Sequence, residues 1–259
     1  MKRRTALVTG FALAGSACVN LRSIGAPIHQ VYDRLLPAAN VQSLLVFLPG
    51  VLDYAEDFER FGFLQAVRQE RLPIDMVAVD ANLRYMQRGL LTDRLHQDVI
   101  APARQRGYAN IWLVGISLGG LSAMLYAARH ADIDGIVSIA PFLGRSAALE
   151  EIARAGGLTR WQPDADTAMF DWERDPHLWL KTYLPSLKSR PSGVSPRLIM
   201  GLGLQDRYYQ EQSQLAASLP PEDVFSAPGI HDWPVWQKLW RTILRTHGDL
   251  LSGYKPQPA

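Results

Sequence analysis

The sequence predicts an α/β fold in which a mostly parallel central sheet is flanked by helices. Strand-like and helix-like segments alternate from about Val41 onward, in the rhythm of parallel strands joined by crossover helices. Several of the strand-like runs are apolar throughout, which is typical of strands that are buried on both faces. A chain of 259 residues with 47% hydrophobic content and no internal repeat is suited to a single core.

Short apolar runs bounded by turn residues mark the expected strands. They cover residues 44–48, 74–79, 111–114, 135–140, 197–202 and 223–227. Helix-like segments stand between or after them, at residues 58–71, 92–106, 118–130, 208–219 and 233–246. Because ligands of such sheets bind beyond the carboxyl ends of the strands, functional residues should directly follow strands.

One long insertion, residues 142–196, interrupts this alternation after the strand that ends at Pro141. We expect it to form a small helical cap, and it is rich in aromatic residues. These residues could enclose an acyl chain or ring above the site, although most of them are expected only to pack the cap onto the body. They are Trp161, Phe170, Trp172, Trp179 and Tyr183.

The most informative motif follows the strand 111–114. There the chain reads Gly115-Ile116-Ser117-Leu118-Gly119-Gly120 and continues into a helix-like segment. In a Gly-x-Ser-x-Gly turn between strand and helix, the serine hydroxyl is exposed at the edge of the sheet. The glycines have no side chains, so neighbouring backbone can approach closely. The context therefore predicts that Ser117 is a catalytic nucleophile.

A serine hydroxyl needs a base to take its proton, and the base needs a third group to orient it. Asp206 follows the strand 197–202 through a short turn, and His231 lies in the loop after the last expected strand. His177, in the insertion, is the main alternative base. Asp206 could instead cap the helix that follows it, and we interpret Asp232 as a loop carboxylate or helix cap.

The elbow, the acid after a late strand and the histidine before the last helix resemble the α/β-hydrolase family over residues 41–246. The resemblance implies that Ser117 is the nucleophile, that His231 is the general base and acid, and that Asp206 orients the histidine. It implies no cofactor.

The same resemblance implies an oxyanion hole built from the backbone N–H groups of Val51 and Leu118. Such donors contribute about 3 to 4 kcal/mol each in comparable sites, because they meet charge that develops only in the transition state. Many lipases and esterases carry His-Gly at the first turn, where this chain has Pro49-Gly50. The glycine that allows close backbone approach is kept.

Together these features predict one α/β-hydrolase domain over residues 41–259 that cleaves a carboxylic ester or thioester of a small molecule through an acyl-enzyme. An acyltransferase with the same triad and a non-enzymatic binding protein on the same fold are the alternatives. The net charge of +2, with dispersed Lys and Arg, predicts no nucleic-acid partner. We expect no metal site, because no His-Glu-x-x-His motif and no clustered carboxylates occur at ligand spacing.

The N-terminus predicts export from the cytoplasm. Residues 2–4 are basic, residues 5–14 form a short apolar run, and the small residues 15–17 precede Cys18, the only cysteine of the chain. Residues 1–18 thus resemble a bacterial lipoprotein signal, which implies lipid attachment at Cys18 and a location in the cell envelope, in the periplasm or at the outer membrane. An ordinary secretory signal and an uncleaved segment of a cytoplasmic protein remain open.

Overall fold

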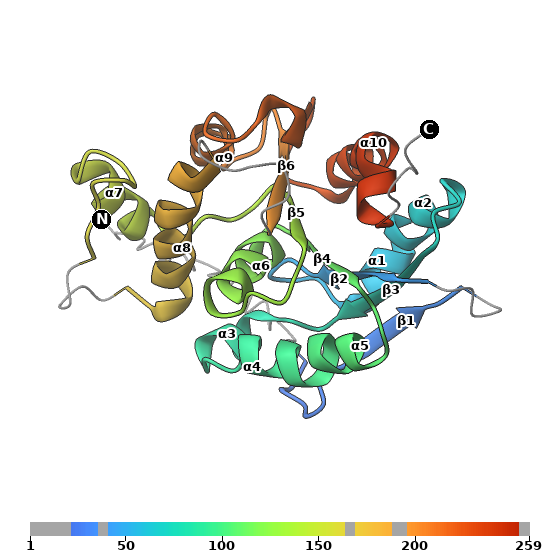
Figure 1. The fold of residues 1–259 in the computed structure, drawn as a ribbon. Coiled ribbons are helices and arrows are strands. Elements are labelled where there is room, and N and C mark those ends of the chain that lie inside the picture. The colour runs from blue at the N-terminus through green and yellow to red at the C-terminus, as the bar shows by residue number, and fades with distance from the viewer. Residues whose placement is uncertain (1–21, 36–40, 164–168, 188–195, 254–259) are drawn as a thin grey trace, which may run out of the picture.

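The computed structural model describes residues 22–35, 41–163, 169–187 and 196–253, and these contain one seven-stranded sheet in the order β1-β3-β2-β4-β5-β6-β7 (Figure 1). Strands β2 to β7 pair in parallel, whereas β1 pairs antiparallel with β3. The prediction of a mostly parallel α/β fold is confirmed. The strands are β1 (Gln30–Asp33), β2 (Ser43–Leu48), β3 (Ile74–Val79), β4 (Asn110–Ile116), β5 (Gly135–Ile139), β6 (Arg197–Gly203) and β7 (Val224–Ala227).

Helices cover both faces of the sheet, because alternate side chains of each central strand point to opposite sides. In β2, Leu45 and Phe47 belong to one core cluster, while Leu44 and Val46 belong to the other. The first cluster is closed by α1 (Ala55–Arg60), α2 (Phe63–Gln69) and α10 (Trp233–Leu251). The second is closed by α3 (Leu83–Gln87), α4 (Leu91–Leu95), α5 (Ala101–Gln105), α6 (Leu118–Arg129), α8 (Asp171–Leu187) and α9 (Tyr209–Ala216).

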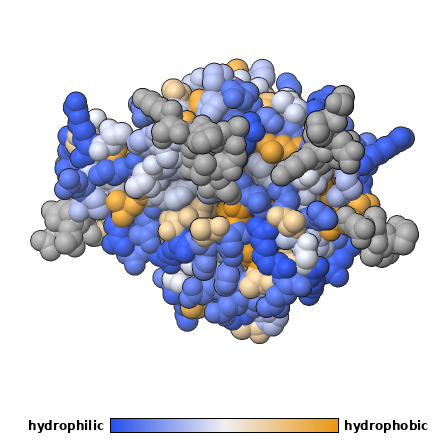
Figure 2. Space-filling model, in the orientation of Figure 1, coloured by the Kyte–Doolittle hydropathy of each residue, from blue (hydrophilic) through white to orange (hydrophobic). Residues whose placement is uncertain are grey.

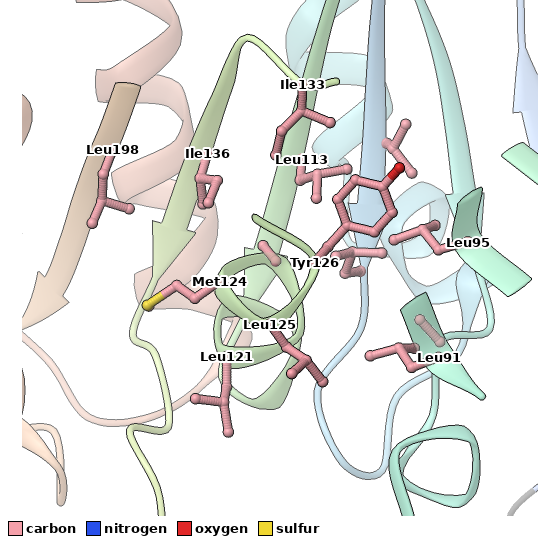
Figure 3. Packing of buried hydrophobic residues seen from close by; sticks show 14 of the residues in the cluster. Leu91, Leu95, Leu113, Leu121, Met124, Leu125, Tyr126, Ile133, Ile136 and Leu198 are labelled. Atoms are coloured by element: carbon pink, nitrogen blue, oxygen red, sulfur yellow. The ribbon is translucent and has the colours of Figure 1, made fainter. Parts of the chain in front are cut away.

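Helix α6 lies at the centre of the second cluster. Its side chains Leu121, Met124, Leu125 and Tyr126 are buried between the sheet and the neighbouring helices (Figure 3). The outer face seen in Figure 2 is mostly hydrophilic, with small and separate apolar patches.

Two of the expected helices are broken in the structure. The segment 58–71 forms α1 and α2 rather than one helix, because Gly62 adopts a left-handed conformation (φ +74°) between them. The segment 92–106 is continuous but mixed, since a π-helical turn over His96–Ile100 separates α4 from α5. Neither break leaves a periodicity signal in the sequence.

One strand and one strand boundary also differ from expectation. Strand β1 precedes Val41 and was not among the expected strands; it is a short antiparallel edge strand, which shows a weak pattern. Asp223 belongs to the 3₁₀ turn Pro221–Asp223 and not to β7, and both oxygens of its carboxylate accept hydrogen bonds from the Arg197 guanidinium.

The insertion contributes α7 (Ser146–Arg154) and α8, and α8 packs against α6. Trp161 is fully buried and donates its indole N–H to Glu151 at 2.8 Å, while Tyr183 is buried and stacks on Trp179. Phe170 is half exposed. Packing therefore accounts for Trp161 and Tyr183.

The predicted lipid attachment site, Cys18, lies outside the described residues, so the signal segment stays a prediction. Across the described ranges no helix combines the length and the apolar character needed to cross a bilayer.

Candidate active site

Ser117 occupies a strained turn between β4 and α6. Its backbone has φ +49° and ψ −116°, a conformation that L-residues rarely adopt. The surroundings hold it there: its N–H donates to the Ile139 carbonyl at 3.0 Å, and its own carbonyl accepts from the N–H groups of Gly120 and Phe142, both at 3.0 Å. The side chain consequently projects beyond the carboxyl end of β4.

The glycines around the serine are required by close packing. A Cβ atom on Gly119 would lie 2.0 Å from the Leu48 carbonyl oxygen, and one on Gly115 would lie 2.2 Å from the Gly119 carbonyl oxygen. Both distances are far inside van der Waals contact with backbone that cannot move freely. The turn after β2 can therefore reach the elbow only because these residues lack side chains.

His231 links the serine to the acid. Its Nε2 lies 2.9 Å from Ser117 Oγ, and its Nδ1 lies 2.7 Å from Asp206 Oδ2. The Ser117 residue is 7% exposed, and the side chains of His231 and Asp206 are 9% and 0% exposed. Ser117 and Asp206 come from the ends of β4 and β6, and His231 comes from the loop after β7, so three distant segments meet at one sheet edge.

Two aromatic rings hold the imidazole. Tyr208 and Trp236 both meet the His231 ring in edge-on contacts, with centroid separations of 5.2 Å and 5.0 Å. The loop itself is joined to the acid turn, since the Gly229 N–H donates to the Gln205 side chain and the Gln205 N–H donates back to the Gly229 carbonyl at 3.0 Å. The orientation of the base is thus set by packing as well as by the carboxylate.

The Asp206 carboxylate is kept ionised. Burial alone would raise its pKa, but hydrogen bonds from His231 and from the Tyr208 backbone N–H at 2.8 Å hold the pKa of Asp206 below its usual value. Oδ1 accepts the Tyr208 N–H just before α9, while Oδ2 accepts from the histidine. The alternative role as helix cap is not the one observed, because the N-cap of α9 is Tyr208; the Asp206 carboxylate instead binds the turn before α9 and the His231 ring.

The other polar candidates lie elsewhere. His177 is buried, its Nε2 is 2.8 Å from the Leu143 carbonyl, and burial lowers its pKa. Asp232 is the N-cap of α10, because its carboxylate accepts the Val235 N–H at 3.3 Å. Of these histidines, His231 is the one that the structure brings to Ser117.

The Pro49-Gly50 turn borders Ser117. Leu48 pairs with Gly115 across β2 and β4, and a Cβ atom on Gly50 would lie 3.6 Å from Ser117 Cβ. Val51 follows directly, and Leu118 opens α6 on the other side of the serine. The two segments expected to supply backbone donors therefore flank Ser117.

Asp53 is a part of the site that the sequence did not reveal. Its Oδ1 accepts the Trp233 indole N–H at 3.0 Å, and its other oxygen lies against Gly50. Burial raises the pKa of this carboxyl group above its usual value. Asp53 thereby joins the turn beside Ser117 to the start of α10, next to His231. No sequence pattern connects positions that are 180 residues apart.

An apolar cavity of about 340 Å³ lies between α7, α8 and α9. Leu143 borders it, and the preceding residue, Phe142, donates its N–H to the Ser117 carbonyl. The remaining wall is mostly aliphatic and includes Leu149, Leu158, Leu180 and Leu184.

A serine held in such a turn, a base within hydrogen-bond distance and a buried carboxylate behind the base form an arrangement that can transfer a proton from the hydroxyl as it attacks a carbonyl carbon. The comparisons with known proteins agree with this chemistry. No curated protein sequence matches the chain. Among solved structures, Est1E from Butyrivibrio proteoclasticus is similar with 17% identity and a TM-score of 0.55, covering 85% of this chain and 94% of its own.

Two further solved structures have the same fold. S-formylglutathione hydrolase from Staphylococcus aureus has 16% identity and a TM-score of 0.56, with 84% of this chain and 99% of that chain covered. A monoacylglycerol lipase from Paleococcus ferrophilus has 14% identity and a TM-score of 0.51, with 88% and 99% covered. The model of the esterase family matches residues 83–247, which is more than half of the sequence. The chain therefore belongs to the esterase family and is a serine hydrolase with the α/β-hydrolase fold.

Proposed function

We propose that the protein hydrolyses a carboxylic ester or thioester through an acyl-enzyme formed on Ser117. The observation that carries the proposal is the relay of contacts from Ser117 Oγ to His231 Nε2 at 2.9 Å and from His231 Nδ1 to Asp206 at 2.7 Å. A base must lie within about 3.2 Å of the proton that it removes, and this distance qualifies without rearrangement.

In the first half of the reaction, Ser117 Oγ attacks the acyl carbon while its proton passes to His231 Nε2. The carbonyl oxygen becomes an oxyanion that accepts hydrogen bonds from the backbone N–H groups of Val51 and Leu118, and the amino end of α6 adds favourable potential. The alcohol or thiol then leaves with the proton from His231. In the second half, water attacks the acyl carbon while one of its protons passes to His231 Nε2. The bond between the acyl carbon and Ser117 Oγ then breaks, and Oγ takes that proton from His231 as the acid is released.

Exposed apolar side chains support a substrate with an apolar part. Leu52 is 63% exposed beside the Val51 turn, and Ile230 is 58% exposed next to His231. The aliphatic cavity beside Leu143 offers further apolar surface. Among the structural neighbours, Est1E has been solved with ferulic acid, an aromatic acid, and another is an S-formylglutathione hydrolase, whose name denotes a thioester. We propose a small acyl or aryl ester or thioester, to be ranked by kcat/KM over a chain-length series.

The direct test is labelling by a fluorophosphonate, followed by intact-mass analysis. The parent protein should gain one adduct located on Ser117, whereas Ser117→Ala should gain none and should lose at least about 10⁴-fold in kcat/KM with an unchanged circular dichroism spectrum. An alanine variant within tenfold of the parent would contradict the nucleophile assignment. If an added alcohol takes most of the acyl group in place of water, the protein is an acyltransferase.

We propose in addition that the mature protein is held at a membrane surface of the cell envelope by lipid on Cys18. The support is the basic, apolar and small-residue order of residues 1–17. Each buried methylene contributes about 0.8 kcal/mol, so stable anchoring requires more than one acyl chain. Mass spectrometry of the N-terminus from a native host should find lipid on Cys18, and Cys18→Ser should release the enzyme from membranes. An unmodified N-terminus beginning at Met1 would contradict the anchor without affecting the hydrolase assignment.

A further inference from the structure

A second cluster of titratable side chains lies at the opposite end of α6 from Ser117. His96 comes from the π-helical turn of the crossover segment, and His130 and Asp132 follow the carboxyl end of α6. Ligand atoms of these three residues, one from each, all lie within 4.8 Å of one another. Because α6 has 12 residues, about 18 Å of helix separates this cluster from the nucleophile, and the proposed reaction does not use it.

The polar contacts of the cluster are already arranged around Asp132. His96 Nδ1 lies 3.1 Å from Asp132 Oδ2, and the Tyr126 hydroxyl donates to Asp132 Oδ1 at 2.9 Å. The tyrosine thus fixes one carboxylate oxygen and leaves the other facing the histidines.

His130 carries a buried nitrogen that has no hydrogen-bond partner in the described residues. This atom, Nε2, is shielded from solvent, although an unpaired buried polar atom normally costs about 1 to 3 kcal/mol. The ring stacks on His96 at a centroid separation of 4.7 Å and on Tyr126 at 4.5 Å.

Charges of both signs surround the cluster: Arg104 donates to the Asp132 carbonyl oxygen at 2.7 Å and Arg129 precedes His130, while negative charge comes from two sources. The carboxyl end of a helix carries a negative partial charge, and Asp132 adds a full one. Two imidazoles and a carboxylate suit zinc, which binds them at about 2.0 to 2.2 Å in a tetrahedron whose other position water can take. The side chains of His96 and Asp132 are 37% and 31% exposed, so an ion can reach the cluster from solvent.

We propose that this cluster is a zinc site, with His96 Nδ1, His130 Nε2 and Asp132 Oδ2 as ligands and water completing the tetrahedron. Ligand atoms around tetrahedral zinc are about 3.3 Å apart. The pair formed by His96 and Asp132 already meets this spacing at 3.1 Å, and the nearly parallel rings of His96 and His130 have to turn so that their nitrogens converge. Zinc binding would replace the contact between His96 Nδ1 and the Tyr126 hydroxyl by a bond to the ion. It would also give the unpartnered His130 Nε2 a bond to the ion.

Zinc bound there would tie three segments together: the crossover helix at its π-helical turn, the end of α6, and the loop that enters β5. Irregular π-helical turns occur often at functional positions, and here the turn supplies the ligand His96. The site would stabilise the fold without taking part in ester cleavage. A ligand that binds only the folded state stabilises it by RT ln(1 + [L]/Kd), so the melting temperature should rise with the logarithm of the zinc concentration once this exceeds Kd.

The test uses the full chain, without a histidine tag and after dialysis against EDTA. Titration with ZnCl₂ in a calorimeter should show one ion per chain, and zinc should raise the melting temperature. His130→Asn, His96→Asn and Asp132→Asn should each weaken zinc binding by at least tenfold. The matched control is His29→Asn, because His29 pairs with Glu56 on another part of the surface and should leave zinc affinity within twofold.

A second measurement covers the case in which a ligand variant does not fold. Co²⁺ added to the parent protein should give the visible absorption of a tetrahedral site with nitrogen and oxygen ligands, and one equivalent of Zn²⁺ should abolish it. Tyr126→Phe, which keeps the ring and removes only the donor to Asp132, should weaken zinc binding by several-fold. Absence of stoichiometric binding at 100 µM zinc, or binding that His130→Asn leaves unchanged, would overturn the proposal.

Discussion

The two ends of α6 carry similar side chains in different settings. At the amino end, His231 contacts Ser117 Oγ at 2.9 Å and Asp206 at 2.7 Å, with side chains at most 9% exposed. At the carboxyl end, His96 contacts the Tyr126 hydroxyl and Asp132, both at 3.1 Å. Each end therefore joins a hydroxyl, an imidazole and a carboxylate. Residue types alone do not distinguish a catalytic group from a structural one.

The difference lies in the backbone that surrounds each group. The amino end of a helix presents free N–H groups and positive potential, which stabilise a developing oxyanion, whereas the carboxyl end presents carbonyl groups and negative potential, which stabilise a cation. Ser117 also occupies a strained turn that projects its hydroxyl. Tyr126, in contrast, is a residue of α6, and its hydroxyl donates a hydrogen bond to Asp132. Helix polarity and burial thus favour an acyl transfer at one end and a metal ion at the other.

The largest expected difference between the ends comes from removing their histidines. His231→Ala should lower kcat/KM by at least about 10⁴-fold, because the serine loses its base, and adding Ser117→Ala should cost little more. His96→Ala should cost less than threefold. Initial rates on an aryl ester measure both. A larger loss from His177→Ala than from His231→Ala would show that another histidine is the base.

The second largest difference between the two ends should come from replacing their carboxylates. Asp206→Asn should lower kcat by about 10³-fold, because the amide no longer stabilises the imidazolium, and loss of the acid costs less than loss of the base. Asp132→Asn should affect zinc affinity instead. Rates at saturating ester measure the first effect, and an Asp206→Asn variant with kcat within tenfold of the parent would remove Asp206 from the mechanism.

The lowered pKa of Asp206 also predicts that the free energy of unfolding depends on pH. Its pKa is lowered in the folded state, so its contribution is present above the unfolded value near 3.8 and is lost as the pH falls through the folded pKa. The difference in unfolding free energy between the parent and Asp206→Asn should therefore shrink below about pH 4. Urea titrations from pH 7 to pH 3 measure it, and a gap that widens toward acid would contradict the lowered pKa.

Tight packing at the amino end gives a smaller effect. Gly119→Ala should lower the unfolding free energy by about 1 to 3 kcal/mol and kcat by at least tenfold, because the new methyl group would meet the Leu48 carbonyl oxygen at 2.0 Å. Gly201→Ala is the matched control, since a Cβ atom there has its nearest neighbours at 3.4 Å, on the Leu239 side chain. Equal stability of the two variants would show that the elbow tolerates displacement of β2.

The smallest effect should come from the residue that positions the turn beside the nucleophile. Asp53→Ala should lower kcat by about tenfold with little change in KM, because the turn loses its link to Trp233 and the backbone donor at Val51 shifts. Asp53→Asn keeps an acceptor for the indole N–H and should restore most of the rate. A change in KM alone would assign Asp53 to substrate binding instead.

Local patterns predicted the groups that lie close together in the chain. The elbow could be predicted because Gly115, Ser117 and Gly119 stand between an apolar run and a helix, so one short window contains the whole feature. The expected order of acid and base placed Asp206 and His231 after the correct strands. The break at Gly62 was missed, because a glycine inside a helical pattern is usually tolerated and only its left-handed backbone separates α1 from α2.

The sequence by itself determined the parallel sheet, the position of the Gly-x-Ser-x-Gly elbow and the chain order of the residues expected to meet there, because apolar runs and turn residues act over a few neighbouring positions. Only the tertiary structure decided that Asp53 meets Trp233, and that His96 meets His130 and Asp132. These contacts join segments whose separation depends on crossover geometry, and no local propensity encodes it. Burial and helix polarity, which set what each cluster can do, exist only once the sheet and its helices have packed.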